Sequence, residues 1–405
     1  MLGKYGIAFG LSETDEVLGN PTGGRARGAV YEGLTQASLG IDLAKAIGLS
    51  GGIFNVSMLQ IHGGGLSVNN IDSLSFVSGI EADRSTRLFE LWYQQSFLGG
   101  KVDVKIGQQS ADEEFLLTQY GSLFINASFG WPTLPTVDLP SGGPAYPLAT
   151  PAVRLRARPT DKTTFLIGVF NGSPAGFGPG DPQLRNASGT AFRVGDGAFV
   201  IGELQYAINQ EDDAKGLPGT YKVGAWYNSN AFDDPFYAAS GLDASGPPVN
   251  GARTHRGDWS IYAVVDQLVF RPAGAKDGGA GVFVRAMGAP GDRNEVSAFV
   301  DAGITYKGAF RHDDTMGLAF GWTRISGSAR DGDALFNATS ARPIPLRGSE
   351  SFIEATYQAQ VAPWWQVQPD VQYVLRPGGG ILNPDGSGRK VGNALVLGVR
   401  TVVTF

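Results

Sequence analysis

Apolar and polar residues alternate along much of the chain with a period of two, the period at which a strand shows its two faces. In NALVLGVRTVVTF (393–405), Leu395, Leu397 and Val399 share one face, and Val396 and Arg400 share the other. On its own, this segment is most simply interpreted as an ordinary half-buried strand of a soluble sandwich. The architecture therefore depends on whether other segments repeat the pattern.

The alternation recurs in segments far from the C-terminus, and its polar face is strongly polar. Amides, carboxylates and guanidinium groups cannot be buried in a dry interior without a cost of several kcal/mol each. One face of each strand therefore needs water, and the other needs an apolar environment. Segment 350–361 opposes Ile353 to Glu354, 365–376 opposes Val371 to Gln368, 151–158 opposes Val153 to Arg154, and 87–97 opposes Phe89, Leu91 and Tyr93 to Glu90, Trp92 and Gln94.

We expect an all-β protein, a single closed antiparallel transmembrane β-barrel of about 16 strands that spans residues 1–405 as one domain. An even number of strands places both termini on the same side, and a barrel of this width can hold water in its bore. The candidate strands are approximately 3–14, 28–43, 49–62, 86–97, 101–109, 151–158, 162–171, 196–208, 219–228, 258–271, 279–288, 294–306, 314–326, 350–362, 364–376 and 391–405.

Short connections between these strands alternate with long ones at 63–85, 110–150, 172–195, 229–257 and 327–349. Short turns at one end and long loops at the other are typical of outer-membrane barrels. A connection of forty residues without a clear element needs a cavity to fold into, and a wide barrel provides one. We therefore expect loops at approximately 63–85 and 110–150 to fold into the lumen and constrict it.

Aromatic residues near strand ends predict two girdles at the membrane interfaces. In this scheme the terminal Phe405 lies at the membrane edge, on the strand that closes the barrel. The candidates are Tyr5, Tyr31, Tyr93, Phe97, Trp226, Trp259, Tyr262, Trp322, Trp364, Trp365, Tyr373 and Phe405.

Composition excludes several other classes of protein. Glycine makes up 59 of 405 residues, about twice the usual ~7%, which suits a β-protein with many turns. There is no cysteine, and the three histidines lack metal-ligand spacing, so we expect no disulfide, metal or cofactor. A net charge of −6 argues against a nucleic-acid partner. No apolar run is long enough for a transmembrane helix. The start, MLGKYGIAFG, lacks the order of a secretory signal, so an exported protein would already have lost it.

The segments RLFELWYQQSFLGGKVDVKIGQQSADEEF (87–115), YGSLFINASFGWPTLPTVDLPSGGPAYPLATPAVRLRARP (120–159) and TTFLIGVFNGSP (163–174) together resemble the carbohydrate-selective porins of the OprB type. The resemblance covers residues 28 to 175 well, and the remainder by strand pattern and the final phenylalanine. It implies a passive outer-membrane channel, in a Gram-negative bacterium, whose inward-folded loops and lumen lining favour sugars.

By motif, the resemblance carries the family's lining residues onto eight positions of this chain. Arginine and carboxylate groups can form paired hydrogen bonds with vicinal hydroxyls, and an indole can cover the C–H face of a sugar ring. The other interpretations are wall charge that holds a loop for Arg154 and Arg156, loop packing for Trp92, and a loop anchor for Trp131. The pore-lining candidates are Arg87, Glu90, Trp92, Asp112, Glu113, Trp131, Arg154 and Arg156.

The expected function is passive diffusion of glucose or related mono- and disaccharides across the bacterial outer membrane. A general or anion-preferring porin for other small hydrophilic solutes remains the alternative, since an arginine-rich strand also suits anions. An outer-membrane enzyme would need a nucleophile with an oriented base, and this sequence shows no such pair. A soluble all-β binding protein is a further alternative. The expected partners are sugars, outer-membrane lipid and lipopolysaccharide, and the barrel assembly machinery. The strand pattern does not decide between monomer and trimer, and the family resemblance favours a monomer.

Overall fold

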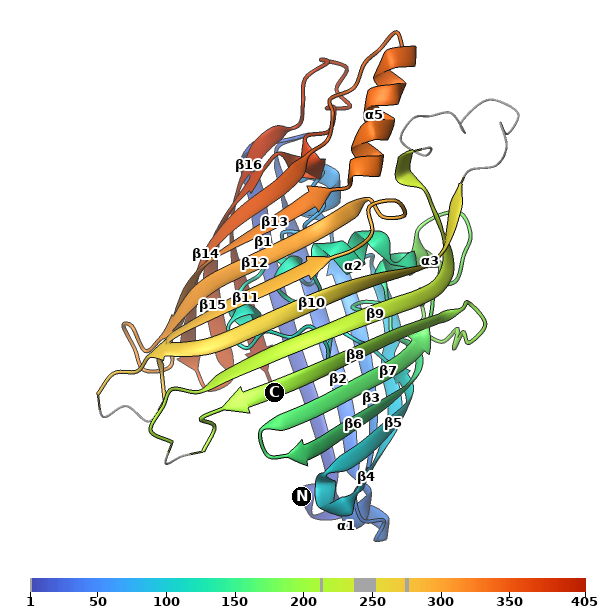
Figure 1. Ribbon diagram of the computed structural model, residues 1–405. Helices are drawn as coiled ribbons and strands as arrows, with labels where there is room; N and C mark the ends of the chain where they lie inside the picture. Colours follow the sequence, from blue (N-terminus) through green and yellow to red (C-terminus); the bar gives the residue numbers. More distant parts are fainter. Residues whose placement is uncertain (1, 212–213, 237–252, 274–276) are drawn as a thin grey trace.

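The computed structural model describes residues 2–211, 214–236, 253–273 and 277–405, which form a closed antiparallel barrel (Figure 1). Each strand pairs with its neighbours in sequence, and the first strand pairs with the last. The sixteen strands of the described residues are β1 (Ile7–Gly24), β2 (Gly28–Asp42), β3 (Gly52–Gly63), β4 (Ser85–Phe97), β5 (Val102–Gln109), β6 (Thr150–Thr160), β7 (Thr163–Asn171), β8 (Ala198–Ile208), β9 (Gly219–Asp233), β10 (Thr254–Phe270), β11 (Gly279–Gly288), β12 (Val296–Lys307), β13 (Thr315–Ile325), β14 (Ser349–Ala362), β15 (Trp365–Leu375) and β16 (Gly392–Thr404).

The helices are short and lie in the connections. None of those in the described residues is long and apolar enough to cross a membrane. They are α1 (Leu43–Ile47), α2 (Thr133–Asp138), α3 (Pro182–Arg185) and α5 (Gly327–Thr339), with a π-helical turn η2 (Ser67–Ile71) and 3-10 turns η1 (Leu2–Tyr5), η3 (Leu98–Gly100), η4 (Gly121–Leu123), η5 (Ala127–Phe129), η6 (Pro140–Gly142) and η7 (Pro377–Gly379).

The predicted strands match the observed ones to within a few residues, except for the first strand and the C-terminal end of the ninth, which was predicted at residue 228 and lies at Asp233. The prediction placed the first strand at 3–14, whereas η1 occupies residues 2–5 and β1 begins only after Gly6, whose φ is +76°. β1 then continues to Gly24, because beyond its last pair with β2 it still pairs with β16, where Gly24 lies opposite Gly392. Of the long connection predicted at 229–257, residues 237–252 lie outside the described part of the chain.

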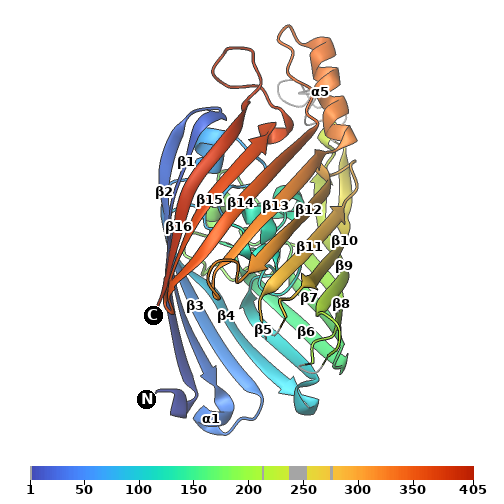
Figure 2. The same cartoon turned by 90° about the vertical axis from the view of Figure 1, so that its left-hand side faces the viewer.

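The long connections all lie at one end of the barrel, as predicted, and the short ones at 25–27 and 289–295 lie there with them. Both termini, α1 and the other short turns lie at the opposite end, whereas α5 and the loop between β15 and β16 lie at the end with the long connections (Figure 2). The two ends of the chain meet along the seam between β1 and β16. There Arg400 forms an ion pair with the buried Glu16 across the lumen face.

The two faces of the wall have the predicted polarity. Leu397 and Val371 point outward and are each 43% exposed, whereas Gln368 and Gln372 on β15 are buried inside the barrel. The apolar exterior therefore faces lipid, and the polar interior faces the bore and the loops within it.

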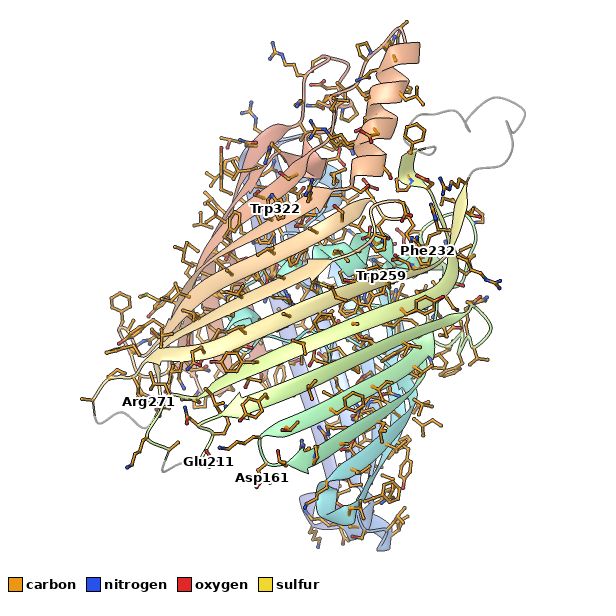
Figure 3. The ribbon with its side chains drawn as sticks, viewed as in Figure 1. Asp161, Glu211, Phe232, Trp259, Arg271 and Trp322 are labelled. Carbon is orange, nitrogen blue, oxygen red and sulfur yellow. The ribbon has the colours of Figure 1, made fainter. Side chains whose placement is uncertain are left out.

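The aromatic girdle is confirmed in part. Trp259 and Trp322 lie on the outer faces of β10 and β13, and the labelled charged residues Asp161, Glu211 and Arg271 lie in turns at the end away from α5 (Figure 3). Trp226 and Tyr262 were placed wrongly. Both point inward, since Trp226 packs against Phe199 and the Tyr262 hydroxyl donates to Glu203 Oε2 (3.0 Å). The period of two itself gives the inward face, since Trp226 alternates in step with Lys222 and Tyr262 in step with Asp266.

Loops 64–84 and 110–149 fold into the lumen, where buried wall residues hold them. Glu350 accepts hydrogen bonds from the N–H groups of Leu74 (2.9 Å) and Ser75 (2.7 Å), and Glu354 accepts from that of Ile125 (2.6 Å). Three strands away, on β11, the fully buried Arg285 donates to three carbonyl groups of loop 110–149. Charged wall residues thus satisfy loop backbone that lies away from bulk water.

Candidate functional site

A β-bulge in β4 sets the geometry of the candidate site. Val56 pairs with Leu91 and Met58 with Leu88, so Ser57 of β3 stands opposite both Phe89 and Glu90. An extra residue in one strand shifts the alternation of its side chains by one position. Arg87 and Phe89 before the bulge, and Glu90 and Trp92 after it, therefore all point into the barrel.

The bulge corrects the sequence prediction for Phe89. We expected this ring on the outer face with Leu91 and Tyr93, but it is 3% exposed and packs against Tyr146 of the lumenal loop. The same bulge explains how Arg87 and Glu90, three residues apart, come to share the inner face. A regular strand would place them on opposite faces.

Arg87 anchors loops and is 1% exposed. Its guanidinium group donates to the carbonyl oxygens of Pro147 (3.1 Å) and Gln183 (3.4 Å) and to Ser85 Oγ (2.9 Å). It therefore joins β4 to two separate loops and has little surface left to offer a solute.

Arg154 lies at the centre of an ion network on β5 and β6. It pairs with Asp103, and its Nε lies 2.7 Å from Glu114 Oε2, while Lys105 pairs with the same Glu114. Arg156 shares Asp103 at 2.7 Å but keeps about a quarter of its side chain exposed. Of the two arginines, Arg154 holds the wall and Arg156 remains accessible to solutes.

Trp92 presents a polarised indole beside this network. The Lys105 ammonium group lies 4.5 Å from the centroid of the ring, and the indole N–H donates to Glu90 Oε2 (3.1 Å). Glu90 also accepts a hydrogen bond from the N–H of Ser110 (3.2 Å) at the start of the lumenal loop. Trp92 is therefore fixed in orientation while part of its ring stays open.

Asp112 and Glu113 follow at the start of loop 110–149. Asp112 accepts hydrogen bonds from Ser110 and from the N–H of Tyr146 (2.9 Å), and burial raises its pKa to about 6. The enclosed position of Glu113 raises its pKa to about 7, and the charges of Asp112 and Glu90 add to the effect. The Glu113 side chain is nevertheless open to the lumen. Both carboxyl groups therefore titrate near neutral pH.

Trp131 lies apart from this cluster, on the wall of a cavity between the lumenal loops. Its indole N–H donates to the carbonyl of Gly142 (3.0 Å), and the residue is 8% exposed. The cavity has a volume of about 530 Å³, and Asp112 and Trp131 line it together with Phe76, Tyr146 and Arg400.

Sequence reasoning missed four residues that shape the site. Asp103 and Lys105 share the inward face of β5, a signal present in the alternation VDVKI that we read only for strand placement. Glu114 was not separated from its neighbours in the DEEF run. Arg400 was expected to face water, but its place on a cavity wall depends on loops remote in sequence.

A family model described as carbohydrate-selective porin, OprB family, matches residues 26–405. Porin B of Pseudomonas aeruginosa is 25% identical over 427 residues, which cover 99% of this chain and 88% of Porin B. The fold is similar to that of OprB from Pseudomonas putida at high pH, with a TM-score of 0.85, 24% identity and coverage of 100% and 95% of the two chains. The outer-membrane channel DcaP of Acinetobacter baumannii is more distant, with a TM-score of 0.53, 10% identity and coverage of 98% and 97%.

A closed barrel with an apolar exterior and a polar bore that contains its own loops defines an outer-membrane channel. The match over residues 26–405 shows that the chain belongs to the OprB family of carbohydrate-selective porins. The protein is thus an outer-membrane porin for the passive diffusion of carbohydrates.

Proposed function

We propose that loops 64–84 and 110–149 constrict the pore of this single-domain barrel, and that sugars are selected beside β4–β6. The observation that carries the proposal is the fixed, partly open indole of Trp92 between Glu90 and Lys105. A sugar ring can rest its C–H face on the indole while its hydroxyl groups bond to Glu90, Glu113 and Arg156.

In this proposal the eight candidates divide into two roles. Arg87, Arg154 and Trp131 are nearly buried and hold the loops in place. Glu90, Trp92, Asp112, Glu113 and Arg156 line the passage. The residues that line the passage offer a sugar few contacts, which suits a channel that must bind a solute weakly enough to release it.

The charge of the cluster argues against an anion-preferring porin. Three cationic side chains, Lys105, Arg154 and Arg156, stand among the five carboxyl groups of Glu90, Asp103, Asp112, Glu113 and Glu114. Two of the cations are nearly buried in ion pairs. With all groups ionised the cluster is net negative, so it disfavours anions and leaves neutral sugars the better solutes.

Block of single-channel current by sugars tests this proposal. We expect glucose to reduce ion current through the purified porin, and Trp92→Ala to weaken the block about tenfold because the stacking surface is lost. Trp259→Ala, on the outer face of β10, is the matched control and should keep the block unchanged. Equal block in Trp92→Ala and the parent protein would contradict the assignment, and strong anion selectivity without sugar block would support the alternative porin.

The remaining partners follow from the surface. We propose that the apolar wall contacts outer-membrane lipid, that the loop end contacts lipopolysaccharide, and that the barrel assembly machinery reads the exposed Phe405. We also propose that the channel carries out no chemical conversion and uses no nucleic-acid partner.

A further inference from the structure

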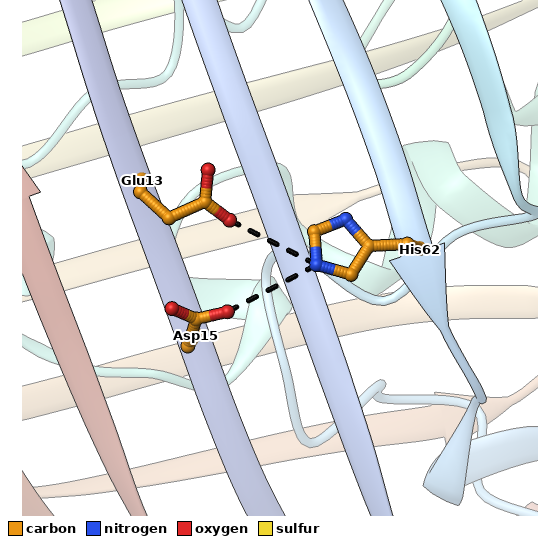
Figure 4. Close-up of side chains that lie close together, drawn as sticks. All are labelled: Glu13, Asp15 and His62. Atoms are coloured by element: carbon orange, nitrogen blue, oxygen red, sulfur yellow. Dashed lines mark ion pairs between the residues drawn. The ribbon is translucent and has the colours of Figure 1, made fainter.

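A cluster of one histidine and two acidic residues lies on the outer face of the barrel, across strands β1 to β3. Glu13 and Asp15 of β1 share the outward face with Phe9 and Val17. His62 of β3 reaches across β2 toward both carboxylates (Figure 4). We name Glu13, Asp15 and His62 the outer-wall cluster, and it is separate from the candidate site inside the bore.

The three side chains of the outer-wall cluster each offer one possible metal ligand. The His62 Nε2 atom lies 3.8 Å from Glu13 Oε1 and 3.9 Å from Asp15 Oδ1, and the three ligand atoms all lie within 4.8 Å of one another. Around a tetrahedral zinc ion with metal–ligand distances of about 2.1 Å, the ligand atoms are about 3.4 Å apart. Side-chain rotations that move each atom by roughly half an ångström therefore bring all three to zinc-binding distances.

Gln60 orients the imidazole ring for metal binding. Its Oε1 atom lies 2.8 Å from His62 Nδ1 and accepts a hydrogen bond from that nitrogen, so the lone pair is on Nε2, the atom that faces the carboxylates. A histidine that binds a metal commonly donates its other ring N–H to an oxygen atom in this way. The Tyr31 oxygen lies 3.0 Å from Nε2, but the Tyr31 hydroxyl donates its single proton to Asp15. The lone pair of Nε2 therefore faces oxygen atoms, and a cation is the group that suits this position.

Gly33 of β2 provides the space in which the imidazole ring lies. It stands directly between Asp15 and His62 in the register of the three strands, and a Cβ atom at this position would overlap the ring. The residues on either side of Gly33 on the outward face of β2 are Tyr31 and Thr35. Their hydroxyl groups donate to Asp15 and Glu13, respectively. Strand β2 therefore orients both carboxylates and leaves a gap for the ring beside them.

The charge of the outer-wall cluster favours a bound cation. In the part of the chain that the structure describes, neither Glu13 nor Asp15 forms an ion pair with a lysine or an arginine. The surrounding wall is apolar, since Phe9 is 63% and Val17 57% exposed on the same face. Carboxylates in such surroundings are costly and rare, and they usually pair with other polar or charged groups. A divalent cation supplies the positive charge that balances both carboxylates.

We propose that the outer-wall cluster binds a zinc ion, with His62 Nε2 and one carboxylate oxygen each of Glu13 and Asp15 as its protein ligands. A nitrogen ligand beside two carboxylates suits zinc, whereas calcium and magnesium prefer oxygen ligands in larger number. The three side chains stay between about a quarter and a third exposed, so a water molecule can complete the coordination. His62 lies one residue before the end of β3, where loop 64–84 begins, so an ion can reach it from water. The proposal concerns the outer wall alone and holds whichever solute the bore selects.

Calorimetric titration of the purified, folded and untagged porin with Zn²⁺ tests the site. The chain has no cysteine and only three histidines, so few other residues compete for the ion. We expect one Zn²⁺ ion per barrel, bound also in a large excess of Mg²⁺ and Ca²⁺, and His62→Ala should weaken binding at least about a hundredfold. His312→Ala is the matched control and should keep the affinity unchanged. His312 is also exposed, and its ring nitrogens lie 3.1 Å from Asp277 and 2.8 Å from Asp313.

Two further variants keep all three ligands and distinguish a built site from binding to scattered surface groups. Gly33→Val fills the space of the imidazole ring, and Gln60→Leu removes the acceptor that orients it, so we expect each to weaken zinc binding about tenfold or more. Ala37→Val, on the same outward face of β2, is the control and should bind zinc as the parent does. Heat-modifiable migration confirms that each variant has a folded barrel. A folded parent that binds no zinc, an unchanged affinity in His62→Ala or Gly33→Val, or displacement of zinc by Mg²⁺ or Ca²⁺ would overturn the proposal.

Discussion

Arg285 offers a direct test of how the lumenal loop is held. Its Nη1 donates to the carbonyls of Leu116 (2.7 Å) and Gly130 (3.0 Å), and its Nη2 donates to that of Ser128 (2.5 Å). The same guanidinium pairs with Asp301 at 2.5 Å, and both side chains are fully buried. Arg285→Ala therefore removes three loop contacts and leaves a buried carboxylate without its partner.

The size of the effect follows from these contacts. A hydrogen bond to a charged group contributes about 1.5–3 kcal/mol, and removal of one partner of a buried ion pair costs about 3–5 kcal/mol. The contacts share one side chain, so their contributions do not add, and we expect loop 110–149 to lose about 3–5 kcal/mol of stability. Since about 1.4 kcal/mol is a factor of ten, the displaced loop becomes at least about a hundredfold more populated.

Single-channel recording measures this change. We expect Arg285→Ala to show higher conductance, more current noise and faster proteolysis of the loop in the folded protein. Arg324→Ala, an exposed position on the outer wall of β13, is the control and should behave as the parent. Arg285→Met with Asp301→Leu removes the anchor without stranding a charge and should still raise the conductance. A folded Arg285→Ala barrel with the conductance and noise of the parent would refute the reasoning.

Two further predictions concern charge and closure. The raised pKa values of Asp112 (about 6) and Glu113 (about 7) keep both carboxyl groups neutral in acid, so raising the pH from about 5 to 8 ionises first Asp112 and then Glu113. The permeability ratio of cations to anions should therefore rise with pH. It should rise less in Glu113→Gln. A ratio independent of pH would contradict this assignment. Removing Phe405, whose N–H donates to the carbonyl of Leu11 (2.9 Å), should lower the amount of heat-modifiable barrel in membranes, and an unchanged amount would count against its role in assembly.

Much of the wall follows from the sequence, because a strand with water on one side and lipid on the other must alternate. The faces of β14, β15 and β16 were predicted residue by residue on this ground. Phe89 was not, because a bulge shifts the alternation and depends on how Ser57 of the neighbouring strand is paired. Trp226 was misplaced because it was assigned to the girdle by residue type, although it shares the lumen face of β9 with Lys222, whose ammonium group donates to the carbonyl of Leu117.

The candidate site could be predicted only in part, because many of its contacts join segments that are distant in sequence. Residue types and inward faces for Glu90, Trp92 and Arg154 follow from motif and period. The buried pairing of Arg154 with Asp103 and Glu114 joins three different segments, and no spacing in the sequence reveals it. The contact of His62 with Glu13 and Asp15 on the outer wall was missed because these residues lie on two strands, and no spacing in the sequence brings them together.

The seam between the first and last strands bears on how the molecule is made. Arg400 and Glu16, which meet across it, are 384 residues apart in the chain. Contacts of such separation form late, because nearly the whole polypeptide must be confined before they can stabilise anything. An interrupted chain that lacks β16 would leave β1 and β15 with open edges, and such edges invite pairing with other chains. The precursor in which β1 and β16 have not yet paired is therefore the species that quality control of this porin must recognise.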